Sequence, residues 1–302
     1  MKHSKIAIIG AGRVGTTTAY ALMLSNIASE IILVDCDKAR CEGEILDLAD
    51  TLAFSATAII RVGSCHDAAQ ADIIIIAAGL AQKPGQPRTE LLKTNSAIIT
   101  SIIDEMQPIN PHAIILVVTN PVDLMALHVY KHAHLPAEQI IGSGTLLDSK
   151  RLQGLVARTL SIAEESVEAY IVGEHGDSQV ALWSSAQISG VPLSHWPEMT
   201  PEFQKTLATQ SRGLVYDIIS CKGSTFFGIA SCAAFICQCI LFDQKRVLPV
   251  SVYDKKRDLY YSLPAVVGAQ GIEQIITIGA NKEEQAALEE SCAVLNAKRT
   301  EL

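Results

Sequence analysis

The sequence lacks any run of basic residues, and acidic side chains outnumber basic ones. Of its 302 residues, 24 are Lys or Arg and 32 are Asp or Glu, which gives a formal net charge of −8. A nucleic-acid or anionic-membrane surface requires clustered positive charge. We therefore expect neither partner, and an anionic ligand must be held by a few local cations.

Long apolar runs are also missing. The runs at 73–78 and 114–118 are much shorter than the roughly 20 residues needed to cross a bilayer. The run at 6–9 is interrupted by Gly10 and Gly12, and no small-residue cleavage site follows it. These absences argue against membrane insertion and secretion, and they favour a cytoplasmic protein.

The eight cysteines include no C-x-x-C pair. Their scatter favours reduced cysteines that behave as small hydrophobic residues in a cytosolic core, rather than a disulfide framework or a zinc site. His128 and His132 have the i, i+4 spacing of metal ligands, but no third ligand lies near them in the sequence. We expect no metal.

In the first half of the chain, short apolar runs alternate with amphipathic segments. The runs are continuous stretches of Ile, Val and Ala, which are typical of parallel strands buried on both faces. The expected strands are Lys5–Ile9, Glu30–Val34, Ala58–Val62, Asp72–Ala77, Ala113–Val118 and Gln139–Ile141, with helical patterns at 45–52 and 91–106 between them. This alternation predicts an α/β fold with a doubly wound parallel sheet of the Rossmann type.

After residues 142–144 the helices become longer. Expected helices are Leu147–Leu160, Pro201–Ser220, Ser224–Leu241 and Lys282–Lys298, and expected strands are Val167–Val172, Val247–Tyr253 and Gln274–Ile278. A chain of this length can form two domains. We predict one domain at 1–142 and a second, α+β domain at 143–302.

A glycine motif follows the first expected strand. Gly10-Ala11-Gly12-Arg13-Val14-Gly15 opens a helix, and the second strand ends in Asp35 about twenty residues later. Gly10 would allow the tight turn, Gly12 the approach of a pyrophosphate, and Gly15 close packing of helix on strand. Asp35 would accept hydrogen bonds from the adenine ribose and repel a 2′-phosphate. We expect domain 1–142 to bind NAD through Gly10, Gly12, Arg13, Val14, Gly15 and Asp35.

Five further segments occur in the order and spacing of one family. They are GLAQKPGQPR at 79–88, VTNPVD at 118–123, GSGTLLDSKR at 142–151, GEHGDS at 173–178 and KGST at 222–225. Together they resemble the lactate and malate dehydrogenases over nearly the whole chain. The resemblance implies an NAD-dependent dehydrogenase of small L-2-hydroxy acids, assembled as a homo-oligomer, either a tetramer or a dimer.

The chemistry of such a reaction explains the residue types. Reducing a 2-keto acid requires a proton for the carbonyl oxygen, and His175 is the natural donor because imidazole titrates near neutral pH. Asp148 would hold the other ring nitrogen, and Arg151, i+3 on the same helix start, would clamp the substrate carboxylate. Arg88, on a loop rich in Gly and Pro, would polarise the keto oxygen.

The remaining site assignments are implied by the resemblance alone. Asn120 would contact the substrate and the nicotinamide region, and Thr225 the variable end of the substrate. The cofactor contacts implied in this way are Ala78, Gly79, Val118, Asn120, Ser143 and Ile229.

Gln82 distinguishes lactate from malate. Malate-specific relatives resemble this loop but carry arginine there, which pairs with the second carboxylate of oxaloacetate. Neutral Gln82 would leave that carboxylate desolvated without a counter-ion, so pyruvate should be preferred, and Thr225 would narrow the pocket around a methyl group. Lys83 could supply a positive charge from another direction, and Pro87 is an unusual residue beside Arg88 that would stiffen the loop.

Two further positions concern activation by fructose 1,6-bisphosphate. Bacterial lactate dehydrogenases that respond to it carry an arginine and a histidine where this chain has Gln153 and Glu168. A site made of glutamine and glutamate would not attract phosphate, so we expect no activation.

Three other functions stay open at this point. Malate dehydrogenase is separated by comparing the turnover of oxaloacetate and pyruvate. An NAD-dependent glycosidase would need a metal, so chelation would inactivate it. A nucleotide sensor without chemistry would not need His175, Asp148, Arg151 and Arg88 together.

Overall fold

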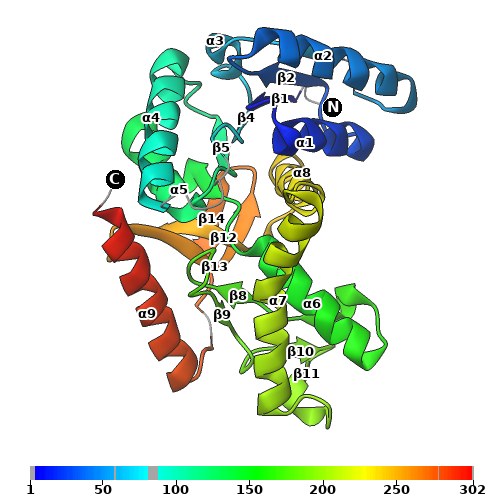
Figure 1. Ribbon diagram of the computed structural model, residues 1–302, viewed down its shortest axis with the longest axis vertical. Helices are drawn as coiled ribbons and strands as arrows, with labels where there is room; N and C mark the ends of the chain where they lie inside the picture. The colour runs from blue at the N-terminus through cyan, green and yellow to red at the C-terminus, as the bar shows by residue number, and fades with distance from the viewer. Residues whose placement is uncertain (1–3, 58, 81–87, 278, 301–302) are drawn as a thin grey trace.

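The computed structural model describes residues 4–57, 59–80, 88–277 and 279–300, with only the backbone for 88–90. In the first half, helices alternate with short strands (Figure 1). In chain order these elements are β1 (Lys5–Ile9), α1 (Arg13–Ser25), β2 (Glu30–Val34), α2 (Lys38–Ala49), η1 (Asp50–Phe54), β3 (Ile59–Val62), α3 (Cys65–Ala68), β4 (Ile73–Ile76), α4 (Arg88–Met106), β5 (Ile114–Val117), α5 (Val122–Ala133), η2 (Ala137–Gln139) and β6 (Ile140–Gly142), where η marks a 3-10 helix.

Strands β1 to β6 form a parallel sheet in the order β6-β5-β4-β1-β2-β3. This confirms the predicted doubly wound sheet. The predicted bounds of β1 and β2 match the structure at both ends, and the other four strands lie within or beside their expected ranges.

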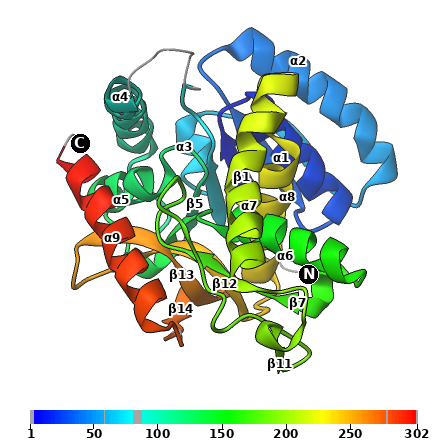
Figure 2. The same ribbon diagram turned by 60° about the horizontal axis from the view of Figure 1, so that its bottom comes forward.

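The strands are apolar on both faces because helices cover both sides of the sheet. Ile6 and Ile8 of β1 belong to a core shared with α1, whereas Ala7 and Ile9 belong to a second core shared with α4 and α5. Figure 2 shows α1 on one side of the sheet and α4 and α5 on the other. Burying one Ile side chain completely adds about 1.5–3 kcal/mol to the free energy of unfolding, so the two cores together stabilise the sheet.

The strand order reverses between β1 and β4. The chain adds β2 and β3 on one side of β1, then crosses back and adds β4, β5 and β6 on the other. Ligands of open α/β sheets bind beyond the carboxyl ends of the strands at such a point. Gly10 and Ala78 follow these two strands and meet there, because a Cβ atom on Gly10 would lie 2.6 Å from the backbone nitrogen of Ala78.

The second half begins with α6 and ends with α9, which lies at the C-terminus (Figure 1). Its elements are α6 (Leu146–Leu160), η3 (Glu164–Ser166), β7 (Val167–Glu168), β8 (Ile171–Val172), β9 (Val180–Ala181), β10 (Gln187–Ile188), β11 (Val191–Pro192), η4 (Leu193–His195), α7 (Pro201–Lys222), α8 (Phe227–Leu241), β12 (Arg246–Asp254), β13 (Leu259–Gly268), β14 (Gly271–Ile275) and α9 (Lys282–Arg299).

Strands of the second half extend the parallel sheet of the first. Ser251 of β12 pairs antiparallel with Gly142 of β6, and β13 and β14 follow. The described sheet therefore runs through nine strands, from β14 to β3. It is continuous across the boundary that we predict between residues 142 and 143.

Strand β13 is missing from the sequence prediction. Pro264 interrupts its pattern, and proline inside a sheet normally breaks the ladder. In the structure Pro264 faces Pro249 of β12. Nearby, the N–H of Ser262 points away from β12 and donates to Gly173. The direction of the backbone N–H alternates along a strand, so position 264, two residues after Ser262, also faces away from β12. Pro264 and Pro249 therefore form a pair in which neither residue has to donate an N–H to the other strand.

Three other element predictions need correction. The helix predicted at Ser224–Leu241 begins only at Phe227, so Ser224 and Thr225 lie in a loop. The strand predicted at Gln274–Ile278 is β14, at Gly271–Ile275. The strand predicted at Val167–Val172 is two short pieces, β7 and β8, which belong to different small sheets.

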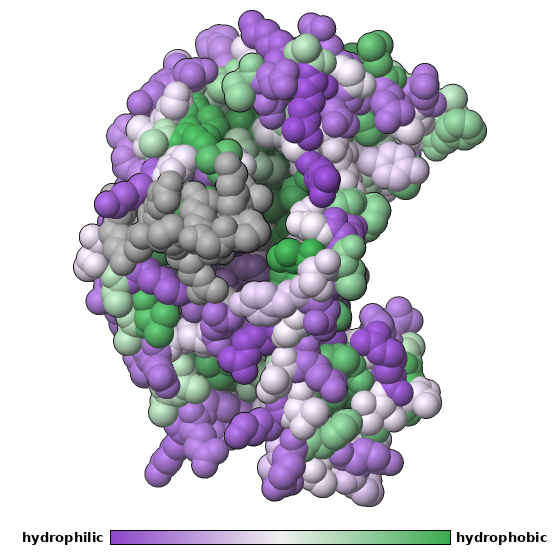
Figure 3. Space-filling view, viewed as in Figure 1, coloured by the Kyte–Doolittle hydropathy of each residue, from purple (hydrophilic) through white to green (hydrophobic). Residues whose placement is uncertain are grey.

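The surface is hollowed on one side. Figure 3 shows the hollow between the upper part, which holds α1, and the lower part, which holds α7. Within the described ranges, no helix is both long enough and apolar enough to span a bilayer.

Candidate active site

The turn between β1 and α1 has the geometry expected of a phosphate cradle. Gly10 has φ of +110°, a backbone conformation that favours glycine. A Cβ atom on Gly12 would meet nothing within 4 Å, so open space lies beside it. Gly12 precedes α1 and no side chain caps that helix, which leaves its positive N-terminal end to an anion. The turn fits the pyrophosphate of a dinucleotide.

Asp35 lies at the edge of this turn, as predicted. Its Oδ2 accepts the backbone N–H of Ala11 at 2.6 Å, and its Oδ1 accepts that of Asp37 at 2.9 Å. These bonds position the carboxylate beside the glycine turn, where a ribose hydroxyl could also donate to it. Val14, in the first turn of α1, packs against the core on that side of the sheet.

The predicted cofactor residues beyond β4, β5 and β6 lie on adjoining loops. Thr119 donates to the carbonyl of Ala78 at 2.7 Å, which joins the loops after β4 and β5. Val118 and Ser143 are both buried at neighbouring strand ends. Gly79 leaves no room for a side chain, because its Cβ atom would lie 2.6 Å from Thr119.

Asn95, which the sequence analysis missed, holds these loops together. It is fully buried in α4. Its Oδ1 accepts the N–H of Leu80 at 2.8 Å, and its Nδ2 donates to the carbonyl of Asn120 at 2.9 Å. The helical spacing could have identified Asn95 from the sequence. It lies four residues after Leu91 and four before Ile99, so it belongs to the apolar face of the helix.

His175 and Asp148 form a hydrogen-bonded pair, as predicted. Nδ1 of His175 lies 2.7 Å from Oδ2 of Asp148, which leaves Nε2 for a substrate. The Asp148 side chain is 5% exposed and that of His175 is 28% exposed, so the imidazole alone can reach solvent. Asp148 belongs to the first turn of α6, where the helix dipole favours a negative charge.

Arg151 completes this cluster. Its Nη1 lies 3.3 Å from Oδ1 of Asp148, and its side chain is 11% exposed. The i, i+3 spacing on α6 brings both side chains to one face of the helix, as predicted. A guanidinium with several N–H groups can hold Asp148 and still offer donors to a second carboxylate.

The charges in this cluster shift the ionisation of its members. Burial disfavours the charged imidazole, but the carboxylates of Asp148 and Asp123 outweigh it and raise the pKa of His175 to about 9. Burial also opposes the ionisation of Asp148, but His175 and Arg151 hold the pKa of that carboxyl below its usual value. The pair therefore favours an imidazolium facing a carboxylate.

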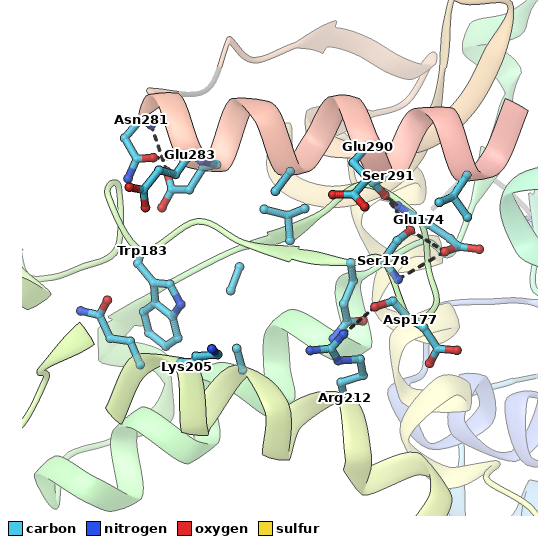
Figure 4. A pocket seen from close by; sticks show the side chains of 18 of the residues that line it. Glu174, Asp177, Ser178, Trp183, Lys205, Arg212, Asn281, Glu283, Glu290 and Ser291 are labelled. Carbon is cyan, nitrogen blue, oxygen red and sulfur yellow. Dashed lines mark hydrogen bonds between the residues drawn. The ribbon is translucent and has the colours of Figure 1, made fainter. Parts of the chain in front are cut away.

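The loop that carries His175 is tied to β13 and α9. Gly173 exchanges two backbone hydrogen bonds of 2.9 Å with Ser262. Glu174 is buried, its N–H donates to Ser291 of α9 at 2.8 Å, and its carboxylate is paired with Lys298. Figure 4 shows Glu174 and Ser291 on the wall of a cleft of about 830 Å³ between α7 and α9. The loop that carries His175 is therefore held in place by contacts with two separate elements.

The loop before α8 contacts the glycine turn, and the start of α8 contacts the start of α6. Arg13 of the glycine turn donates to Ser224 at 3.0 Å, next to the half-buried Thr225. A Cβ atom on Gly228 would lie 2.9 Å from Leu147, so the start of α8 packs on the start of α6. Ile229 packs against the same core as Val14.

Part of the predicted site lies outside the residues that the structure describes. Gln82, Lys83 and Pro87 lie outside the described residues. Arg88 is the first residue of α4, and the structure describes its backbone but not its side chain. His128 and His132, which have the spacing of metal ligands, make hydrogen bonds within the protein. His128 bonds with Thr100 at 2.8 Å, and His132 bonds with the carbonyl of His128 at 2.8 Å.

Comparison with protein families gives two matches. Residues 4–142 match the lactate/malate dehydrogenase NAD binding domain, and residues 145–301 match the lactate/malate dehydrogenase alpha/beta C-terminal domain.

Individual relatives agree with these matches. L-lactate dehydrogenase A of Rhizopus oryzae is 45% identical over 97% of this chain and 91% of its own. L-lactate dehydrogenase of Clostridium botulinum (strain 657 / Type Ba4) is 41% identical over 97% and 95%.

Two solved structures are also similar. A lactate dehydrogenase from a Medee basin deep-sea metagenome library has a TM-score of 0.95 and 34% identity, and the match covers 100% of this chain and 99% of the other. The minor L-lactate dehydrogenase of Enterococcus mundtii, in a ligand-bound form, has a TM-score of 0.95 and 34% identity, covering 99% and 98%.

Proposed function

The chain belongs to the lactate/malate dehydrogenase family, and from that premise we propose that it is an L-lactate dehydrogenase that reversibly reduces pyruvate. Its cofactor is NAD, since the first 142 residues contain the NAD-binding domain of the family. The open position beside Gly12 and the uncapped start of α1 fit that cofactor. When bound, NADH supplies the hydride.

One observation carries the proposal for the chemistry. His175, Asp148 and Arg151 form a connected cluster, with separations of 2.7 Å and 3.3 Å between partners. Arg151 binds the substrate carboxylate. His175 donates its Nε2 proton to the keto oxygen on reduction and accepts it back on oxidation. Asp148 orients the ring and stabilises its charged form, as the aspartate of a catalytic triad does.

The other predicted residues complete this proposal. Gly10, Gly12, Arg13, Val14, Gly15 and Asp35 hold the adenosine and pyrophosphate, and Ala78, Gly79, Val118, Asn120, Ser143 and Ile229 lie along the nicotinamide half. Arg88 polarises the keto oxygen. Gln82 and Thr225 face the variable end of the acid. We also propose that residues 1–142 and 143–302 act as the dinucleotide-binding and substrate domains.

Substrate choice tests the proposal. Rates of NADH oxidation with pyruvate, oxaloacetate and 2-ketoisocaproate, measured side by side, should give the highest kcat/KM for pyruvate. A second carboxylate beside neutral Gln82 loses hydration without a counter-ion. Several kcal/mol of such a cost corresponds to a preference of about 10²-fold or more.

Two variants make this test specific. Gln82→Arg should raise kcat/KM for oxaloacetate and lower it for pyruvate, because it introduces the missing cation. Lys83→Gln tests the other cation of this loop: if Lys83 supplies no charge to the substrate, the ratio should stay close to that of the parent. Faster turnover of oxaloacetate than pyruvate by the parent would identify a malate dehydrogenase instead.

The pH dependence follows from the raised pKa of His175, about 9. Reduction needs the protonated ring, so its rate should be steady through neutral pH and fall above about pH 9. Oxidation needs the neutral ring, so its rate should rise over the same interval. Asp148→Asn removes the carboxylate that raises this pKa most, and both midpoints should move towards the usual histidine value of about 6.5. Initial rates from about pH 5 to 10 in both directions measure this, and unmoved midpoints would contradict it.

Fructose 1,6-bisphosphate should not activate the enzyme. Gln153 is buried and its amide donates to the carbonyl of Ala169 at 3.0 Å. Glu168 is exposed and adds negative charge nearby on β7. Titrating the sugar bisphosphate into a pyruvate-reduction assay should leave the pyruvate saturation curve in place. A shift of that curve to lower pyruvate concentrations would disprove the prediction.

We further propose a homo-oligomer, a tetramer or a dimer, located in the cytoplasm. Leu46 and Phe54 are 72% and 83% exposed on α2 and η1, and Leu24 of the adjoining α1 is 51% exposed. Large apolar side chains gathered on a surface are typical of protein–protein contacts. All eight cysteines are free, which suits a reducing compartment.

A further inference from the structure

A second carboxylate is hydrogen-bonded to the backbone of the candidate catalytic histidine. Oδ2 of Asp123 accepts the backbone N–H of His175 at 2.8 Å, and Oδ1 accepts the hydroxyl of Ser251 at 2.6 Å. Asp123 is 2% exposed and Ser251 is fully buried. Neither residue was predicted from the sequence as part of the site.

Asp123 joins segments that are distant in the sequence. It belongs to the first turn of α5, three residues after Asn120, whereas Ser251 belongs to β12 and His175 to the loop before β9. A carboxylate is costly to bury. Here the two hydrogen bonds and the charge of His175 partly offset that cost, and burial raises the pKa of Asp123 to about 6, so the group is mostly ionised at neutral pH.

Asn would meet the same hydrogen-bonding requirements without a charge. An amide oxygen can accept the N–H of His175, and an amide nitrogen can donate to a rotated Ser251 hydroxyl. Anchoring the loop therefore does not by itself require a carboxylate. What a carboxylate adds is a negative charge close enough to interact with the imidazole.

We propose that Asp123 is a positioning residue for His175, which holds the backbone of that residue in place and supplies a second negative charge that favours the protonated imidazole. This inference rests on the proposed function, in which the imidazolium is the proton donor to the keto acid. Asp148 orients the ring through its Nδ1, whereas Asp123 acts through the backbone N–H of His175 and through the charge of its carboxylate.

The other ionisable groups around the pair are few in the described residues. Asp148 and Arg151 face His175 from α6, with opposite effects on its pKa. Glu174, in the same loop, opposes the ionisation of Asp123 but is itself paired with Lys298. Cys292 of α9 also lies close enough to interact with Asp123, and burial raises the pKa of that thiol to about 11, so it is neutral near pH 7.

Asp123→Asn is the discriminating variant. It keeps both hydrogen bonds and removes the charge, so the titration midpoint of His175 should fall by about one pH unit. The direct measurement is a ¹³C NMR titration of protein labelled at the histidine ring carbons, with His175→Gln to assign the signal. In kinetics, pyruvate reduction by the variant should match the parent below about pH 7 and fall by up to about tenfold relative to it above about pH 9.

Ser251→Ala is the second variant. It leaves the carboxylate but removes a hydrogen bond that favours its ionised form. The Asp123 pKa is about 6 in the parent, so the carboxylate stays ionised in this variant near pH 9, where His175 titrates, and the His175 midpoint should stay close to the parent value. Ser251→Ala therefore separates the lost charge from the lost hydrogen bond. If Asp123→Asn does not fold, Asp123→Ser, which also removes the charge, takes its place.

The outcomes separate the possibilities. A midpoint that stays at the parent value in every folded variant that removes the Asp123 charge would overturn the proposal and leave Asp123 as a structural anchor. An equal fall in Ser251→Ala would also overturn it, because the charge is still present there. The NMR titration needs no substrate, so it reports on Asp123 even if the parent protein reduces no keto acid. A parent protein that reduces no keto acid would reject the proposed function but not the role of Asp123.

Discussion

Replacing His175 with glutamine lowers kcat for pyruvate reduction by about 10²- to 10⁴-fold, the range that a positioned acid or base contributes. Glutamine can still bond to Asp148, so the loop keeps its shape, but it has no proton to give near neutral pH. Nucleotide binding should survive, because the glycine turn and Asp35 lie on the first half of the chain. Stopped-flow single turnovers and calorimetric titration with NADH measure the two quantities.

His195→Gln is the matched control. His195 is an exposed histidine of the short helix η4 and takes no part in the cluster. It should leave both kcat and NADH affinity at the parent values. Equal turnover by the His175 variant and the control would remove His175 from the mechanism.

Among the variants, Arg151→Lys has the second largest expected effect. Lysine keeps the positive charge beside Asp148 but cannot present two parallel N–H donors to a carboxylate. Loss of one charge-assisted hydrogen bond costs about 1.5–3 kcal/mol, which corresponds to about 10- to 100-fold in kcat/KM. The loss should occur mainly in KM for pyruvate, since binding of the carboxylate precedes the chemical step. Steady-state kinetics at saturating NADH measure it.

The same helix offers a control for Arg151. Arg158 lies two turns later on α6, is 65% exposed, and pairs with Glu164 at 3.9 Å. Arg158→Lys should change kcat/KM by less than about twofold, as is usual for exposed ion pairs. If Arg151→Lys is as mild as this control, the substrate carboxylate is held elsewhere.

The sequence predicts the first half of this fold well because its signals are local. Continuous Ile stretches such as 73–76 can only be stable where both faces are covered, and the glycine turn directly follows such a strand. His175, Asp148 and Arg151 were found because their chemistry is unusual and their segments resemble a family. Their contacts at 2.7 Å and 3.3 Å agree with that interpretation.

The features that the sequence does not predict depend on pairing between residues that are distant along the chain. Pro264 argues against a strand until Pro249 is known to face it, which no local pattern reveals. Asn95 and Asp123 are buried polar residues of α4 and α5, and their partners are 15 to 128 residues away. A buried polar residue must have a partner, but the sequence does not say which. Their importance emerges only from the folded chain.

The pairing of Ser251 with Gly142 has an implication for how such a protein can be divided or recombined. A fragment that stopped after β6 would expose that strand's unpaired N–H and C=O groups, and exposed strand edges recruit foreign strands. The same cut would separate Ser251 from Asp123, leaving a buried carboxylate without its hydroxyl partner. Recombination at this boundary would therefore succeed only between parents whose strand edges and buried polar groups match on both sides of the cut.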